Sequence, residues 1–318
     1  MYKIAIIEEI HEDGLKILEQ NPNFEFELIK DISKENLIKK LPSFDACTLR
    51  VSKLDESILK HCPNLKVVSR HGVGYDNVDT NFLKKNNVTL LITATANAVS
   101  VAEHVMSMFL SISKSIKTYD KEVRNGNFKN NARNIQTFEL LNKNVLIAGF
   151  GRIGKKLISK CLAFGMKVSV FDPYVDEKKI SDFGGKKANS IKDSLSNADF
   201  VSLHMPLTKE TKNLIDYSVL KSMKKNSIIV NTARGGIINE EDLNKALNEG
   251  LIFGAGLDVF INEPIEKNNP LLKNEKVILS PHSATFTDEC TSRMGIETTK
   301  NIIDFFENKI DKSMIVKL

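Results

Sequence analysis

The chain has 318 residues, 42% of them hydrophobic and 27% charged, which is typical of a water-soluble globular protein with about two domains. No apolar run approaches the ~18 residues of a membrane-spanning helix, and acidic residues close behind the first apolar run do not fit a signal peptide, so we expect a cytoplasmic protein without a membrane partner. The net charge of +5 comes from lysines interleaved with acidic residues, which argues against a nucleic-acid partner.

Short β-rich runs alternate with helix-period segments over the first 97 residues. The predicted strands are 2–7, 24–29, 46–51, 65–70 and 88–93. The predicted helices lie near 11–20, 33–41, 55–61 and 79–86. This alternation predicts a parallel sheet with helices on both faces.

A longer helical pattern begins near Asn97 and Ser100 and extends to about Arg124, where Gly126 can end it. Its length predicts one helix that bridges two domains. A second alternation follows, with strands predicted at 144–149, 167–172, 199–204, 227–233, 254–260 and 276–282 and a last helix at about 287–308. Both halves of the chain therefore indicate the α/β class.

The four cysteines, Cys47, Cys62, Cys161 and Cys290, form no CxxC pair. Each lies in or beside an apolar stretch, so we expect reduced thiols in or near the core. The sequence indicates no metal site.

A glycine motif of the form GxGxxG, Gly149-x-Gly151-x-x-Gly154, lies between a predicted strand and a predicted helix. The next predicted strand ends in Asp172, 23 residues after the first glycine. This context predicts a dinucleotide site, with phosphates at the helix start and ribose hydroxyls on the aspartate. The carboxylate repels a 2′-phosphate, so the cofactor is expected to be NAD. Arg152 either touches a phosphate or faces solvent, and the motif alone would also fit a purely structural turn.

Three residues follow later predicted strands: Arg234, Glu263 and His282. Because ligands collect at the carboxyl ends of parallel strands, these side chains are expected to converge. Arginine suits a substrate carboxylate, protonated histidine suits proton delivery to a developing alkoxide, and a carboxylate behind the histidine fixes its orientation. Each residue alone is more often structural, but together they indicate catalysis.

The chain resembles the D-isomer-specific 2-hydroxyacid dehydrogenases along essentially its whole length. The segments that carry the resemblance are GVGYDNVD (72–79), NAVSVAEH (97–104), GFGRIGK (149–155), LHMPLTKETKNLI (203–215), NTARGGIINEEDL (231–243), GLDVFINEP (256–264) and LSPHSA (279–284). The resemblance implies two doubly wound parallel-sheet domains. A discontinuous flavodoxin-like substrate domain would comprise 1–97 and 286–318, and a Rossmann-type NAD domain would comprise 98–285. It also implies a homodimer whose interface includes much of the helix at 98–124.

The resemblance also implies individual roles. Arg234 would bind the substrate carboxylate, and His282 would act as acid and base with Glu263. The implied cofactor contacts are Asp258 with the nicotinamide carboxamide, Pro206 in the adenosine pocket, and Ile153, His204, Thr211 and Thr232 along the rest of the cofactor. Backbone N–H groups of Val73 and Gly74 would grip the substrate carboxylate.

The GVGYDNVD segment is most similar to phosphoglycerate dehydrogenases, which implies oxidation of 3-phosphoglycerate to 3-phosphohydroxypyruvate in serine biosynthesis. Arg50 and Arg70 match phosphate-contacting arginines of that group, and Arg133 would add a third. A dianionic phosphate favours two or more cations. The alternative is that the first two arginines pair with the nearby Asp55 or Asp76.

Two features favour other substrates. The chain ends near Leu318, without the regulatory domain that many phosphoglycerate dehydrogenases carry, and ITATANAVS departs from the TPGxN-like spelling common in the family. Hydroxypyruvate, glyoxylate or another short 2-oxo acid is therefore an alternative. A formate- or phosphite-type dehydrogenase and an NAD-sensing corepressor of the C-terminal-binding-protein group are more remote ones.

Overall fold

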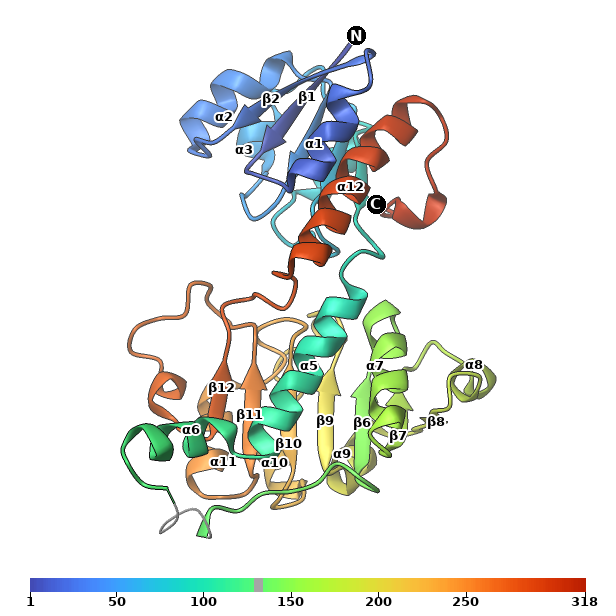
Figure 1. Ribbon diagram of the computed structural model, residues 1–318. Helices are drawn as coiled ribbons and strands as arrows, with labels where there is room; N and C mark the ends of the chain where they lie inside the picture. Colours follow the sequence, from blue (N-terminus) through green and yellow to red (C-terminus); the bar gives the residue numbers. More distant parts are fainter. Residues whose placement is uncertain (129–133) are drawn as a thin grey trace. The chain divides into compact units, whose positions relative to one another are not determined.

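The structure is a computed structural model that describes residues 1–128 and 134–318. These residues divide into two compact units. Unit 1 comprises Met1–Asn97 and Phe286–Leu318, and unit 2 comprises Ala98–Thr285. Each unit is built on one parallel sheet with helices on both faces, which confirms the predicted α/β class (Figure 1).

Unit 1 contains a five-stranded sheet in the order β2-β1-β3-β4-β5, the flavodoxin-like order. Its strands are β1 (Tyr2–Ile7), β2 (Phe24–Ile29), β3 (Ala46–Leu49), β4 (Val67–Arg70) and β5 (Thr89–Ile92). Its helices are α1 (Glu12–Glu19), α2 (Lys34–Lys40), α3 (Glu56–Leu59), α4 (Thr80–Lys85) and α12 (Asp288–Phe306), with short 3₁₀ segments η1 (Leu41–Ser43) and η4 (Lys312–Met314).

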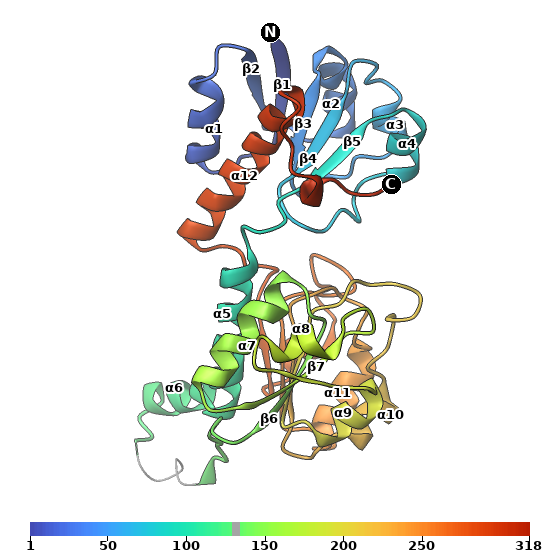
Figure 2. The same cartoon turned by 90° about the vertical axis from the view of Figure 1, so that its right-hand side faces the viewer.

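The core of unit 1 lies on both faces of this sheet. Along β1, Ile4 and Ile6 pack with α1 and α12, whereas Ala5 and Ile7 pack with α2, α3 and α4. This is the two-residue period of a strand whose two faces are both covered. Figure 2 shows the two helical layers on either side of the strands.

Unit 2 contains a seven-stranded sheet in the order β12-β11-β10-β9-β6-β7-β8. Its strands are β6 (Asn144–Ala148), β7 (Lys167–Phe171), β8 (Lys186–Lys187), β9 (Phe200–Leu203), β10 (Ile228–Asn231), β11 (Gly254–Leu257) and β12 (Val277–Leu279). Its helices are α5 (Ala98–Ser113), α6 (Ile116–Arg124), α7 (Arg152–Ala163), α8 (Glu177–Ser181), α9 (Ile191–Asn197), α10 (Tyr217–Ser222) and α11 (Glu240–Asn248), with a 3₁₀ segment η3 (Pro270–Lys273).

The strand order of unit 2 reverses direction between β6 and β9, so the sheet is doubly wound. In sheets of this kind, ligands bind beyond the carboxyl ends of the strands at the point of reversal. Helices α5 and α7 cover one face, where Phe109 packs edge-on against Phe200 of β9. Helices α9, α10 and α11 cover the other face. Within the described residues, no helix is long and apolar enough to cross a bilayer.

The prediction of one long helix ending near Arg124 is wrong. The chain forms α5 and then α6, and the break falls at Ser115, whose φ of 50° and ψ of 38° are left-handed. The Ser115 hydroxyl donates to the carbonyl of Gln136 (3.0 Å), so a residue 21 positions away stabilises the break. Apolar periodicity continues through the junction, which is why the sequence pattern did not reveal it.

Candidate active site

The glycine motif forms the turn between β6 and α7. Gly149 has a φ of 114°, and a Cβ there would lie 2.6 Å from the carbonyl oxygen of His204, so only glycine fits. A Cβ on Gly154 would lie 2.3 Å from the carbonyl oxygen of Gly149, so this glycine lets the helix start close to the strand. Gly151 is the N-cap of α7 and supplies no capping side chain, which leaves the first helical N–H groups available to an anion.

Asp172 follows β7 and faces the same turn. Its Oδ2 atom accepts a hydrogen bond from the N–H of Phe150 (2.9 Å), and its Oδ1 atom accepts one from the N–H of Tyr174 (3.0 Å). A carboxylate has about four acceptor positions, so lone pairs remain for two ribose hydroxyls. Arg152, at the first position of α7, is exposed.

Two polar side chains at the ends of β9 and β10 have buried atoms without a hydrogen-bond partner in the described structure. They are Nδ1 of His204 and Oγ1 of Thr232. The other ring nitrogen of His204 lies 2.8 Å from the Ser202 hydroxyl, and burial lowers the pKa of this histidine to about 4, so it is neutral at pH 7. Buried polar atoms need partners, and a bound cofactor at this edge fits that need.

The turn after β9 carries Pro206 and Thr211. The Thr211 hydroxyl donates to the Pro206 carbonyl (2.7 Å) and accepts from the N–H of Thr208 (2.7 Å). The turn is thereby closed on itself beside His204.

Glu263 and His282 form a hydrogen-bonded pair beyond β11 and β12. Nδ1 of His282 lies 2.7 Å from Oε2 of Glu263, and Oε1 of the same carboxylate accepts the N–H of Phe260 (3.0 Å). Burial alone would raise the pKa of Glu263. The bonds from His282 and Phe260 and the charge of Arg234 outweigh burial and lower it below its usual value. Glu263 is therefore an ionised partner for the histidine at neutral pH.

Arg234 follows β10 and is held at its backbone. Its carbonyl accepts a hydrogen bond from the Asn231 side chain (2.8 Å), and its guanidinium donates to the carbonyl of Ala233 (2.6 Å). Its charge acts on Glu263, so all three predicted catalytic residues lie at one edge of the unit 2 sheet. His282 is half-exposed, which leaves its Nε2 side open to a reactant.

Asp258, at the end of β11, is fully buried behind the segment that carries His282. Its Oδ1 atom accepts from the Ser280 hydroxyl (2.5 Å) and the N–H of Ser283 (2.8 Å), and its Oδ2 atom accepts from the N–H of Ala284 (3.0 Å). His104 of α5 lies 2.9 Å from the same Ser280 hydroxyl. These bonds hold His282 at its left-handed φ of 53°. The sequence does not predict this role for Asp258, because its partners lie more than 20 positions away.

In unit 1, Arg50 and Arg70 both act electrostatically on His71. Burial, together with the charges of the two arginines, lowers the pKa of His71 to about 4. The Arg50 guanidinium lies over the Phe286 ring (5.9 Å) and donates to the carbonyl of Glu9 (3.4 Å), and Arg70 donates to the carbonyl of His71 (2.7 Å). Both guanidinium groups of unit 1 therefore favour the neutral form of this buried histidine.

Asp55 pairs with Lys53 (3.2 Å). The alternative that Arg50 and Arg70 pair with Asp55 or Asp76 stays a prediction. Val73 and Gly74 lie partly buried in the loop after β4. Arg133 lies outside the described residues. In the part of the chain that the structure describes, no three His, Cys, Asp or Glu side chains are grouped as metal ligands.

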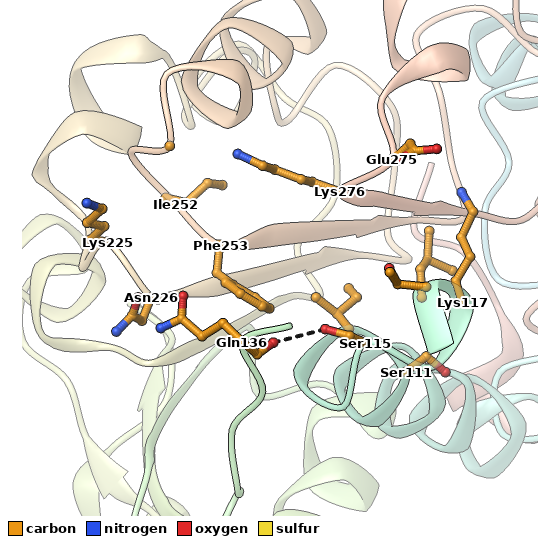
Figure 3. Close-up of a pocket in the computed structure, with 14 residues that line it drawn as sticks. Ser111, Ser115, Lys117, Gln136, Lys225, Asn226, Ile252, Phe253, Glu275 and Lys276 are labelled. Carbon is orange, nitrogen blue, oxygen red and sulfur yellow. Dashed lines mark hydrogen bonds between the residues drawn. The ribbon is translucent and has the colours of Figure 1, made fainter. Parts of the chain in front are cut away.

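A hollow of about 280 Å³ lies at the opposite edge of the unit 2 sheet, where β10, β11 and β12 begin (Figure 3). Its lining includes Asn226, Phe253 and Lys276. The amino group of Lys276 donates to the carbonyl of Leu247 at the end of α11 (2.6 Å), the usual use of a lysine at a helix C-terminus. The hollow is thus separate from the dinucleotide turn and from the catalytic residues.

Comparison with known proteins agrees with this geometry. A family model described as "D-isomer specific 2-hydroxyacid dehydrogenase, NAD binding domain" matches residues 106–284. The chain is 33% identical to the D-3-phosphoglycerate dehydrogenase of Methanocaldococcus jannaschii over 316 residues, which are 99% of this chain but only 59% of that protein. It is 34% identical to the glyoxylate reductase of Thermococcus litoralis over 324 residues, which cover 99% of this chain and 97% of that protein.

Among solved structures, the D-lactate dehydrogenase of Aquifex aeolicus, in complex with NAD and lactic acid, matches with a TM-score of 0.86 at 28% identity and 98% coverage of both chains. The chain therefore belongs to the D-isomer specific 2-hydroxyacid dehydrogenase family.

Proposed function

We propose that this chain is an NAD-dependent oxidoreductase that interconverts a small 2-hydroxy acid and its 2-oxo acid. The observation that carries the proposal is the His282–Glu263 pair under the charge of Arg234, at the same sheet edge as the dinucleotide turn. When bound, the nicotinamide supplies or accepts a hydride. In reduction, His282 donates the proton from Nε2 to the substrate oxygen, Glu263 holds its ring, and Arg234 binds the substrate carboxylate.

The proposed cofactor contacts lie at the turn and at the strand ends. N–H groups of Arg152, Ile153 and Gly154 at the start of α7 bind the pyrophosphate, with Gly149 and Gly151 allowing its approach, and Asp172 binds the adenosine ribose. Pro206 and Thr211 line the adenosine side. His204 and Thr232 would supply further along the cofactor their buried atoms that lack a partner in the described structure. Asp258 would accept the carboxamide N–H.

For the substrate we propose 3-phosphoglycerate and assign its phosphate to Arg50 and Arg70 of unit 1. The support is that both arginines lie close to His71 in unit 1, where Arg70 donates to the His71 carbonyl (2.7 Å) and Arg50 donates to the Glu9 carbonyl (3.4 Å). Val73 and Gly74 are proposed to bind the substrate carboxylate through backbone N–H groups, and unit 1 is accordingly the substrate domain. Arg133 is proposed as a third cation for the substrate phosphate. The serine-biosynthetic role rests on this substrate.

A second candidate activity is the reduction of glyoxylate or hydroxypyruvate. Relatives carry both kinds of name at almost equal identity: 33% for the phosphoglycerate dehydrogenase above and 34% for the glyoxylate reductase. A hydroxypyruvate reductase of Thermotoga maritima is also 33% identical. Identity does not separate the candidates, so the proposal for phosphoglycerate depends on the arginines.

We also propose a homodimer that uses α5 and α6. No residue of α6 is buried, yet Ile116 and Val123 lie two turns apart on one face and are 53% and 55% exposed. An amphipathic helix whose apolar side chains stay about half exposed against the described part of the chain is suited to cover a second copy.

The test of the activity is NADH oxidation by purified protein with 3-phosphohydroxypyruvate, hydroxypyruvate, glyoxylate and pyruvate. We expect the phosphorylated acid to be preferred about a hundredfold in kcat/KM, which corresponds to ~2.7 kcal/mol. Preference for an unphosphorylated acid would transfer the assignment to the second candidate. Tight NADH binding with no turnover of any acid would refute both and favour an NAD-sensing binding protein.

A further inference from the structure

Glu240 is a buried carboxylate outside the catalytic trio. It is the first residue of α11 and is 9% exposed. Its Oε1 atom accepts the backbone N–H of Ile261 (2.7 Å), and its Oε2 atom accepts the side-chain amide of Asn269 (2.7 Å). Both bonds reach across to the loop after β11. Acidic side chains at a helix N-terminus commonly interact only with the positive end of the helix dipole. Such a carboxylate would not need to be buried or to make these distant contacts.

The loop that Glu240 contacts is the one that carries Glu263. Ile261 follows Phe260, whose N–H holds Oε1 of Glu263 (3.0 Å), and Oε2 of that carboxylate holds His282 (2.7 Å). Asn269 lies at the other end of the loop and caps η3 through its Oδ1 atom (3.0 Å to the N–H of Leu271). Glu240 thus bonds to both ends of the segment that contains Glu263.

A close backbone contact joins this loop to Arg234 as well. Gly235 packs so tightly that a Cβ there would lie 1.9 Å from the carbonyl oxygen of Phe260. The residue after Arg234 and the residue before Ile261 are therefore in contact. Helix α11 begins only five residues after Gly235. Glu240 therefore forms a second connection between the loop that carries Arg234 and the loop that carries Glu263.

We propose that Glu240 is a positioning residue for catalysis: it ties the Glu263 loop to the start of α11 and so holds the Glu263 carboxylate against His282. This role rests on the proposed function of the trio. Glu240 touches no reacting atom in this scheme. It acts through two consecutive backbone N–H groups. The N–H of Ile261 donates to Glu240, and the N–H of Phe260 donates to Glu263.

The chemistry of the contact requires a carboxylate. Ile261 N–H and Asn269 Nδ2 are both donors, and the Asn269 oxygen is committed to the cap of η3. Two donors need two acceptor oxygens, which glutamate has and glutamine lacks. Glu240→Gln keeps the size of the side chain but sets an NH₂ group against one donor. This buried mismatch should loosen the loop without emptying the site.

The test compares Glu240→Gln with Glu241→Gln. Glu241 is exposed in the same first turn of α11, so the control makes the same charge change near the same helix end. Two readouts are used: the pH profile of kcat for 2-oxo acid reduction, and an NMR pH titration of the His282 ring, assigned with His282→Asn. A fluorescence titration with NADH counts the protein molecules that bind the cofactor, here called competent sites.

For Glu240→Gln we expect kcat per competent site to fall about tenfold. We also expect the alkaline limb of the profile and the His282 NMR midpoint to move to lower pH together, because a loosened carboxylate stabilises the imidazolium less. Glu241→Gln should match the wild type in both.

A lower yield of competent sites with an unmoved NMR midpoint would show that Glu240 is only structural and would overturn the proposal. The NMR midpoint needs no substrate. If wild-type protein reduces none of the acids, the proposed function fails, yet the comparison of midpoints still decides whether Glu240 positions Glu263.

Discussion

The Nδ1 atom of His282 lies 2.7 Å from Oε2 of Glu263, and the backbone on both sides of this contact is held by buried side chains. Asp258 binds the segment around His282, and Glu240 binds the loop around Glu263. The pair is therefore preorganised by two buried carboxylates of unit 2, as an active site that must deliver a proton in one geometry requires.

His282→Asn should lower kcat for reduction by about 10²- to 10⁴-fold, because general acid catalysis is lost. Glu263→Gln should have a smaller effect, since the ring keeps its place through its backbone but loses the charge behind it. Steady-state kinetics checks both, with NADH affinity as the internal control. Near-normal turnover by His282→Asn would remove the histidine from the mechanism.

Asp172→Ser should shift the cofactor preference toward NADPH by at least about tenfold, roughly 1.4 kcal/mol, because the carboxylate that repels a 2′-phosphate is removed. The ratio of kcat/KM for NADH and NADPH measures the shift. Asp182→Ser, a change at an exposed aspartate beyond α8, is the matched control. An unaltered ratio in Asp172→Ser would mean that another group selects the cofactor.

Arg50→Gln and Arg70→Gln should each lower kcat/KM for 3-phosphohydroxypyruvate by about 10- to 100-fold, the worth of a hydrogen bond to a charged group. Hydroxypyruvate, which lacks the phosphate, should change by less than about threefold. Arg124→Gln removes an exposed arginine paired with Asp120 and should change neither. Equal losses on both substrates would assign the two arginines to the structure of unit 1.

Acid should destabilise both units through buried histidines. The pKa values of His71 and His204 are lowered to about 4, whereas an unfolded histidine titrates near 6.5. Between these values the unfolded chain binds more protons, so the stability present above about pH 6.5 is lost as pH falls toward 4, on the order of 3 kcal/mol per histidine.

Urea unfolding at a series of pH values checks this loss. His71→Gln should reduce the slope of the unfolding free energy against pH in that window, and His61→Gln, at an exposed position, should not. Equal slopes in all three proteins would show that His71 does not contribute.

Ile116→Asp combined with Val123→Asp should convert the proposed dimer to a monomer, because two charges would replace the apolar face of α6. Light scattering coupled to gel filtration measures the mass. Thr118→Asp, on an exposed position of the same helix, should keep the wild-type mass. A wild-type chain that is already a monomer at micromolar concentration would refute the dimer itself.

The sequence by itself determined the features that depend on neighbours along the chain. Alternating strands and helices follow from local periodicity, and the turn at Gly149 follows from residues within one strand–turn–helix unit. The order of the strand ends also placed Arg234, Glu263 and His282 at one sheet edge, since parallel strands share their carboxyl edge.

Only the tertiary structure decided what depends on residues brought together from a distance. The break at Ser115 is stabilised by the carbonyl of Gln136, 21 positions away. Asp258 bonds to residues 25 and 26 positions away, and Glu240 bonds to Ile261, 21 positions away. In the sequence, an acidic residue at a helix start is indistinguishable from an ordinary partner of the helix dipole. Burial and the two donors facing it distinguish Glu240, and these exist only once β11 and α11 have packed into one unit.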